Sequence, residues 1–145
     1  MALTITESEW QKLRRHAEET YPQECCGVLL GRIGADEIKA VHAAIPCRNA
    51  RTDSAHNRYC IGPDELIRIQ REARERELAV IGFYHSHPDG HARWSHTDLA
   101  DAHWSGCSYV ITNVENGHAV DTNAFVLIGE ERNKRFDDEA ITRQA

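Results

Sequence analysis

Residues 82–88 read Gly-Phe-Tyr-His-Ser-His-Pro, and an apolar run over 78–84 leads into them. Such a run is typical of a buried β-strand. If the strand continues through His87, the side chains of His85 and His87 project from the same face, because successive residues of a strand alternate between faces. Pro88 is expected to end the strand, since proline lacks the backbone donor that a sheet requires.

Two imidazoles on one strand face can hold a single metal ion, and Asp98 lies close enough in sequence for a loop to return a carboxylate to that ion. Two histidines and one carboxylate leave the fourth position of a tetrahedral zinc site open to water. This pattern is typical of a catalytic rather than a structural zinc site.

A plainer interpretation exists for the same residues. His-x-His pairs are common without a metal, and Ser95 to Asp98 also fits a capping box at a helix start. In a capping box the Asp98 carboxylate would accept a hydrogen bond from a backbone amide. We expect this role and metal binding by Asp98 to exclude each other.

The residues His85-Ser86-His87-Pro88, followed by Ser95 and Asp98, resemble the signature of the JAMM (MPN+) metalloproteases. A second segment, residues 21–31, reads Tyr-Pro-Gln-Glu-Cys-Cys-Gly-Val-Leu-Leu-Gly. It resembles the segment that carries the catalytic glutamate in the short prokaryotic members of that family. Both motifs occur in the family's order along the chain.

The resemblance implies one zinc ion per chain, held by His85, His87 and Asp98, and no other cofactor. It also implies that Glu24 moves protons as a general base and that Ser95 donates a hydrogen bond to the developing oxyanion. We therefore expect a zinc metallopeptidase of the JAMM type.

The order of helical and strand patterns predicts an α/β (α+β) domain that spans residues 1–145. The resemblance adds a curved mixed β-sheet flanked by helices, similar in plan to the cytidine deaminases. A capping box at Thr6 and Glu9 predicts the first helix. The other expected elements are strands over 25–32 and 37–45, a loop over 46–57, a short strand over 58–61, a helix from Pro63, the motif strand, a helix over 95–104, and strands over 107–114 and 118–128. No element is assigned to residues 130–145.

Composition excludes several function classes. The chain has 145 residues, 41% of them hydrophobic and 28% charged, as in an ordinary globular domain. A net charge of −6 disfavours nucleic acid as a partner. No apolar run is long enough for a membrane helix, and the first residues lack a signal-peptide pattern. We expect a cytoplasmic protein without a membrane partner.

Family members remove ubiquitin-like proteins from their adducts or cleave after a terminal Gly-Gly. The chain resembles prokaryotic members that act on small β-grasp sulfur carriers or protein modifiers, including those that release cysteine from a carrier. We therefore expect hydrolysis of the bond after the C-terminal Gly-Gly of a ubiquitin-like protein. A homodimeric state is left open.

Three alternatives are weighed against this prediction. The first is a non-catalytic MPN scaffold or interaction module, which is expected to lack ligand residues that this chain retains. The second is a cysteine hydrolase that uses Cys25 or Cys26, which would resist chelators but be inactivated by thiol alkylation. The third is a zinc nucleobase deaminase, which the absence of a Cys-x-x-Cys pair disfavours.

Overall fold

The computed structural model describes residues 2–51, 59 and 61–145. Strands and short helices alternate along the chain. In order they are β1 (Ala2–Thr6), α1 (Glu7–Thr20), β2 (Cys26–Ile33), β3 (Lys39–Cys47), α2 (Pro63–Glu75), β4 (Ala79–Pro88), α3 (His96–Asp101), β5 (Ser108–Glu115), β6 (His118–Ile128) and β7 (Arg135–Gln144). Residues 58 and 60 of the predicted strand over 58–61, and residues 52–57 of the predicted loop over 46–57, lie outside the described residues. The start of that loop belongs to β3 instead, which continues through Cys47.

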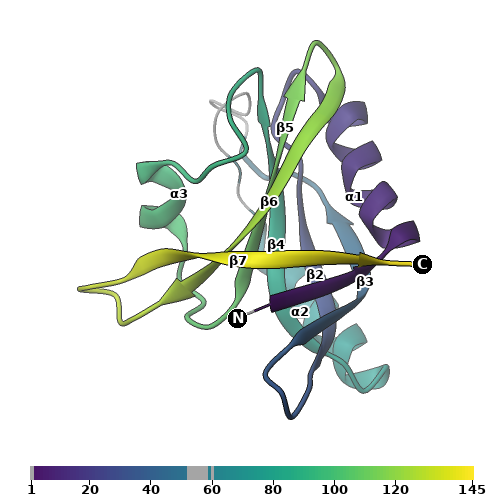
Figure 1. Cartoon of the computed structure of the whole chain (residues 1–145), viewed down its shortest axis with the longest axis vertical. Coiled ribbons are helices and arrows are strands. Elements are labelled where there is room, and N and C mark those ends of the chain that lie inside the picture. The colour runs from purple at the N-terminus through teal and green to yellow at the C-terminus, as the bar shows by residue number, and fades with distance from the viewer. Residues whose placement is uncertain (1, 52–58, 60) are drawn as a thin grey trace.

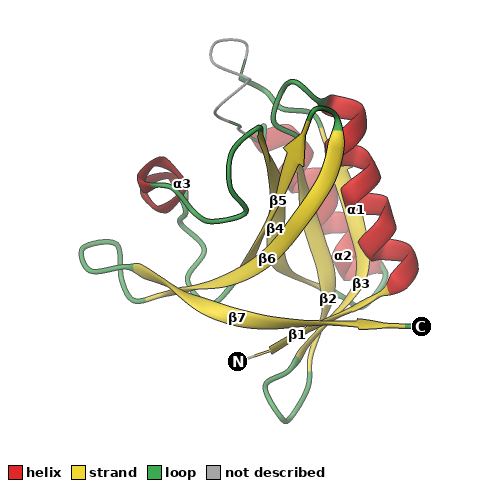
Figure 2. Ribbon diagram, turned by 45° about the horizontal axis from the view of Figure 1, so that its top comes forward, coloured by secondary structure: helices red, strands yellow, loops and turns green. Residues whose placement is uncertain are grey.

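The strands pair side by side in a closed ring with the order β1-β3-β2-β4-β5-β6-β7. β1 runs parallel to both β3 and β7, and β4 runs parallel to β5. The remaining neighbours are antiparallel. Figures 1 and 2 show the helices packed around this strongly curved sheet. The predicted mixed sheet flanked by helices is confirmed, and its closure into a ring is an additional finding.

The segment that received no assignment from the sequence forms β7 and completes the ring. β7 pairs antiparallel with β6 and parallel with β1, so that Ala140 lies opposite Ala2. The side chain of Phe136, on β7, is buried and packs edge-on against the ring of Tyr109. A charged segment therefore becomes a strand because it finds backbone partners on both sides.

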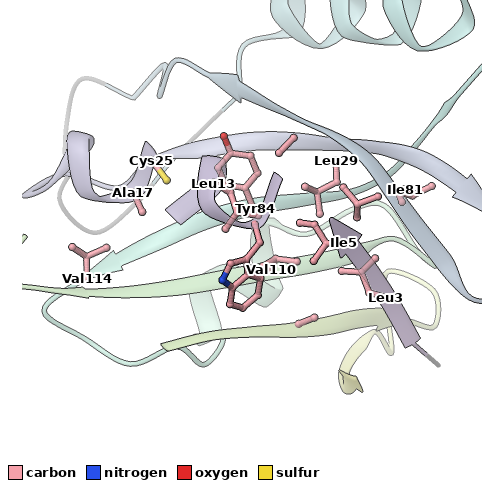
Figure 3. Packing of buried hydrophobic residues seen from close by; sticks show 14 residues of the cluster. Leu3, Ile5, Leu13, Ala17, Cys25, Leu29, Ile81, Tyr84, Val110 and Val114 are labelled. Atoms are coloured by element: carbon pink, nitrogen blue, oxygen red, sulfur yellow. The ribbon is translucent and has the colours of Figure 1, made fainter. Parts of the chain in front are cut away.

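Alternate residues of the central strands build two separate cores. Leu29, Tyr84 and Val110 face the inside of the ring, where they pack with side chains of β1 and α1 (Figure 3). Val28, Phe83 and Ile111 face the opposite way, toward α2. The alternation of a strand thus places an apolar layer on each face of β2, β4 and β5.

Glu9 departs from the predicted capping box of α1. Thr6 caps the helix as expected, because its Oγ1 accepts a hydrogen bond from the Glu9 amide at 3.4 Å. The carboxylate of Glu9 instead accepts a hydrogen bond from the amide of Ala44 at 2.8 Å. It thereby satisfies a backbone donor of β3 and ties α1 to the sheet.

A buried charged cluster spans the inner face of the ring. Lys39 Nζ on β3 donates to Ser108 Oγ on β5 at 2.8 Å and lies 3.3 Å from the Glu139 carboxylate on β7. Ser108 Oγ in turn donates to the other carboxylate oxygen of Glu139. The positive and negative charges compensate each other, as burial requires.

Among the described residues, no helix has the length and apolar character needed to cross a bilayer.

Candidate metal centre

β4 carries both histidines to one end of the ring. The strand runs through His87 and ends at Pro88, as predicted. The Nε2 atoms of His85 and His87 lie 3.3 Å apart, so both rings project from one face. His85 lies two residues after Phe83 on β4, so both side chains project from the same face, and this face packs on α2.

The loop after β4 returns a carboxylate to these two rings. Asp98 Oδ1 lies 3.2 Å from His85 Nε2, and Asp98 Oδ2 lies 3.0 Å from His87 Nε2. The loop is held by side-chain hydrogen bonds at three of its residues. Tyr21 Oη donates to Asp89 Oδ2 at 2.6 Å, the Gly90 amide donates to Asn113 Oδ1 at 3.0 Å, and Asn123 Nδ2 donates to the Ala92 carbonyl at 2.9 Å. The position of Asp98 is therefore fixed by the sheet and not only by α3.

Asp98 forms the capping box and also faces both histidines, so the capping role does not turn its carboxylate away from them. Ser95 Oγ accepts a hydrogen bond from the Asp98 amide at 3.0 Å, and Asp98 Oδ2 accepts one from the Ser95 amide at 2.8 Å. A carboxylate has about four lone-pair sites, which is enough for a backbone amide and further partners. The capping contact orients the carboxylate toward the histidines.

Glu24 approaches the same place from β2. Cys26 lies opposite His85 in the antiparallel β2–β4 pair, and Glu24 lies two residues before Cys26, the first residue of β2. One carboxylate oxygen of Glu24 lies within 4.8 Å of ring nitrogens of His85 and His87. The residue is only 3% exposed, and its Oε1 has no hydrogen-bond partner among the described residues. Burial raises the pKa of Glu24 to about 8; His87 opposes this shift and Asp98 adds to it.

The hydrogen bond of His87 to the loop indicates that a cation belongs between these groups. Its Nδ1 lies 2.7 Å from the carbonyl oxygen of His91, which can only accept, so Nδ1 carries the proton. In the neutral ring Nε2 then presents a lone pair to the lone pairs of Asp98 Oδ2. Two acceptors at 3.0 Å repel each other unless a proton or a metal ion lies between them.

The donor set fits a zinc ion. Tetrahedral ligands at about 2.0–2.1 Å from zinc are about 3.3 Å apart, and the three donor separations here are 3.0, 3.2 and 3.3 Å. The carboxylate of Glu24 lies within 4.8 Å of both histidine nitrogens, close enough to reach the same ion or to lie beside it.

The prokaryotic homologs of the JAB domain form a family whose sequence profile matches residues 6–128. The chain belongs to this family. The predicted resemblance to the JAMM metalloproteases is thereby confirmed.

Two curated relatives of this JAB-domain protein carry enzyme names. It is 32% identical over 111 residues to a desampylase of Haloferax volcanii, with 77% of each chain covered. It is 27% identical over 113 residues to a CysO-cysteine peptidase of Mycobacterium tuberculosis, with 78% of this chain and 74% of the relative covered. A solved structure of a Salinibacter ruber protein matches with a TM-score of 0.72 and 33% identity, over 95% of this chain and 90% of the other.

Cys25 and Cys26 lie in environments that do not favour a reactive thiol. Cys25 is 2% exposed and its side chain belongs to the inner core, on the opposite face from the histidines. Burial raises the pKa of its thiol to about 12, so the nucleophilic thiolate is scarce at neutral pH. Cys26 is fully buried in the other core. This environment disfavours the cysteine-hydrolase alternative for both residues.

Three residues around the candidate metal centre were missed by sequence reasoning. The ring of Tyr59 stacks on the ring of His85 with centroids 4.5 Å apart, and Tyr59 also lines an adjoining cavity of about 340 Å³. Ser86 and Asn49 form hydrogen bonds to the backbone beside Glu24. Ser86 lies inside the quoted motif, and this position was the one sequence signal that could have indicated any of the three residues. Tyr59 and Asn49 lie in the predicted short strand over 58–61 and the predicted loop over 46–57, where no motif indicated a role at the metal centre.

The raised pKa of Glu24 predicts a pH-dependent stability cost in metal-free protein. The folded state binds a proton that the unfolded chain releases near pH 4.5, so the cost grows from there to about pH 8. Glu24→Gln removes the titrating group, and should stabilise metal-free protein relative to wild type more at pH 8 than at pH 5. We expect a difference on the order of 1–3 kcal/mol between the two pH values. Denaturant unfolding after chelation measures it, and a pH-independent difference would contradict the prediction.

Proposed function

We propose that this chain is a zinc-dependent peptidase or isopeptidase that hydrolyses the bond after the C-terminal Gly-Gly of a ubiquitin-like, β-grasp carrier or modifier protein. The observation that supports it best is the convergence of two imidazole nitrogens and one carboxylate beside a second, buried carboxylate. The relatives named desampylase and CysO-cysteine peptidase support this substrate class. We also propose a cytoplasmic location and a single domain over residues 1–145, as the composition predicts.

His85, His87 and Asp98 would hold one zinc ion per chain. When bound, zinc supplies Lewis acidity toward the scissile carbonyl and lowers the pKa of water to about 7. The chain orients its ligands through neighbouring groups: His87 by the His91 carbonyl, Asp98 by the Ser95 amide, and His85 by the stacked ring of Tyr59. Such outer contacts fix ring orientation and tautomer.

Glu24 would act as the proton carrier of the reaction. Its carboxylate takes one proton from the attacking water while the oxygen of that water bonds to the acyl carbon. It then delivers the proton to the amine as the carbon–nitrogen bond breaks, so that an acid and a free amine result. A carboxylate whose pKa is raised toward neutrality can both accept and return a proton.

Ser95 would stabilise the substrate oxygen as negative charge develops on it. In its capping role the Ser95 hydroxyl acts as acceptor, from the amide of Asp98. Its own O–H proton can therefore donate to a substrate oxygen next to Asp98. A single donor of this kind typically contributes about 10²–10³ in rate.

Selectivity for Gly-Gly would come from the approach of the substrate backbone. Glycine has no Cβ, so a Gly-Gly tail can run through a passage in which any side chain would collide. We predict that a folded β-grasp carrier ending in Gly-Gly is cleaved at least about 10-fold faster than the same carrier ending in Ala-Ala. Both fusions carry the same following peptide, and cleavage is followed by mass spectrometry.

Two results would contradict the carrier-processing proposal. Equal cleavage of the Gly-Gly and Ala-Ala fusions would remove the Gly-Gly requirement. Equal cleavage of an unfolded protein such as casein would remove the requirement for a folded carrier. Either result would still leave a metallopeptidase, whereas no cleavage of any substrate by zinc-loaded protein would favour the scaffold alternative.

A further inference from the structure

The peptide group that joins Glu24 to Cys25 is held from both sides by side chains. Its carbonyl, the one that belongs to Glu24, accepts a hydrogen bond from Asn49 Nδ2 at 3.2 Å. Its amide, the one that belongs to Cys25, donates to Ser86 Oγ at 2.8 Å. We infer that Asn49 and Ser86 are positioning residues that fix the Glu24 carboxylate beside the metal centre. The inference rests on the proposed role of Glu24.

Side chains replace the regular sheet at this point. β2 begins at Cys26, and its pairing with β4 is regular from Cys26 and His85 onward. One position earlier the Ser86 amide still donates to the Cys25 carbonyl, at 3.3 Å. The reciprocal bond goes from the Cys25 amide to the hydroxyl of Ser86 and not to its carbonyl. Glu24 thus lies just outside the regular pairing.

Ser86 connects the histidine strand directly to the segment that carries Glu24. Its neighbours in sequence are His85 and His87, but its side chain projects from the opposite face of β4, because strand residues alternate. It therefore cannot reach the ion and instead reaches β2. Ser86 is fully buried, so no solvent replaces its hydroxyl if it is removed.

Asn49 is itself oriented for this contact. Its Oδ1 accepts a hydrogen bond from the Arg51 amide at 3.0 Å, which turns the Nδ2 donor toward the Glu24 carbonyl. Asn49 also forms an isolated β-bridge with Ile61. The segment after β3 is thereby linked to the backbone of Glu24.

The backbone restraint matters because the Glu24 side chain has few restraints of its own. Its Oε1 has no partner among the residues that the structure describes. The direction of the carboxylate is then determined largely by the peptide group behind it. A proton carrier must lie within hydrogen-bond reach of the proton it moves, and a displacement of about 1 Å can cost about 10²-fold in rate.

The test compares Ser86→Ala and Asn49→Ala in two backgrounds, wild type and Glu24→Gln. The zinc-loaded full chain is assayed with the Gly-Gly fusion, and zinc content and melting temperature are recorded. In the wild-type background each substitution should lower kcat by about 10-fold or more and leave KM within about two-fold. In the Glu24→Gln background each should change the residual kcat by less than about two-fold, because the position of a glutamine that accepts no proton has little effect.

Ser108→Ala is the matched control. It also removes a buried, hydrogen-bonded serine hydroxyl, but from the Lys39–Glu139 cluster on the inner face. It should lower the melting temperature and leave kcat unchanged in both backgrounds. Ser86→Thr, which keeps the hydroxyl, should restore most of the kcat lost in Ser86→Ala. If Asn49→Ala does not fold, Asn49→Leu replaces it, because leucine has a similar shape, carries no charge and lacks the donor.

The outcomes separate the inference from the proposed function. Wild-type kcat in Ser86→Ala and Asn49→Ala, or equal losses in both backgrounds, would overturn the inference while Glu24-dependent cleavage stands. Cleavage that survives Glu24→Gln would overturn the proposed role of Glu24 and the inference with it. Amide exchange at Cys25, followed by NMR, needs no activity: it should accelerate at least about 10-fold in Ser86→Ala, and unchanged exchange would also overturn the inference.

Discussion

Glu24→Gln is expected to lower kcat by about 10²-fold or more while zinc stays bound at one per chain. The amide keeps the shape of the side chain, so the ion and its three ligands remain undisturbed. It cannot accept the proton of the attacking water or return it to the leaving amine. Steady-state cleavage of the Gly-Gly fusion, together with metal analysis of the same sample, measures both quantities.

Glu9→Gln is the control for this loss. Glu9 is a partly buried glutamate whose carboxylate accepts a hydrogen bond from the Ala44 amide, on the inner side of the ring and away from the histidines. It should affect stability and not turnover. A near wild-type kcat in Glu24→Gln would show that another group carries the proton. Asp98 also places a carboxylate beside the histidines.

His87→Ala is expected to abolish both stoichiometric zinc binding and cleavage. The substitution removes one of three protein donors and the contact that orients Asp98 Oδ2. The protein should stay folded, because both apolar cores are built from other residues. Metal analysis after dialysis and circular dichroism test the two statements separately.

His91→Ala is a close control for that variant. His87 contacts the backbone carbonyl of His91, and not its exposed ring, so an alanine keeps the contact. Zinc content and cleavage should therefore stay at the wild-type level. Stoichiometric zinc in His87→Ala would show that the ligand assignment is wrong.

The convergence of His85, His87 and Asp98 could be predicted from the sequence because most of its geometry is local. A two-residue spacing on a strand fixes the relation between His85 and His87, and one loop brings back Asp98. Glu24 was different: from its residues alone it was only a carboxylate before an apolar strand, and the family resemblance supplied its role. The structure brings it to the histidines through the β2–β4 pairing.

What sequence reasoning missed depends on partners far along the chain. Glu9 matches a local capping pattern, but a backbone donor on β3 binds its carboxylate instead. Glu139 lies in a charged segment and is nevertheless buried, because its carboxylate accepts hydrogen bonds from Lys39 and Ser108 on other strands of the ring. Asn49 and Ser86 act on backbone groups, which carry no residue identity and leave no pattern in a sequence.

The parallel pairing of β1 with β7 has a consequence for how the protein folds. It joins Ala2 to Ala140, so a newly made chain cannot complete this contact until almost all of its residues have left the ribosome. Contacts between residues so distant in sequence slow folding, because most of the chain must be ordered before they form. The pairing of β2 with β3 and with β4 joins residues that are closer in sequence, so it can form before β7 is available. We therefore expect the strands that carry the histidines to assemble early and the sealing of the sheet by β7 to be the late, rate-limiting event.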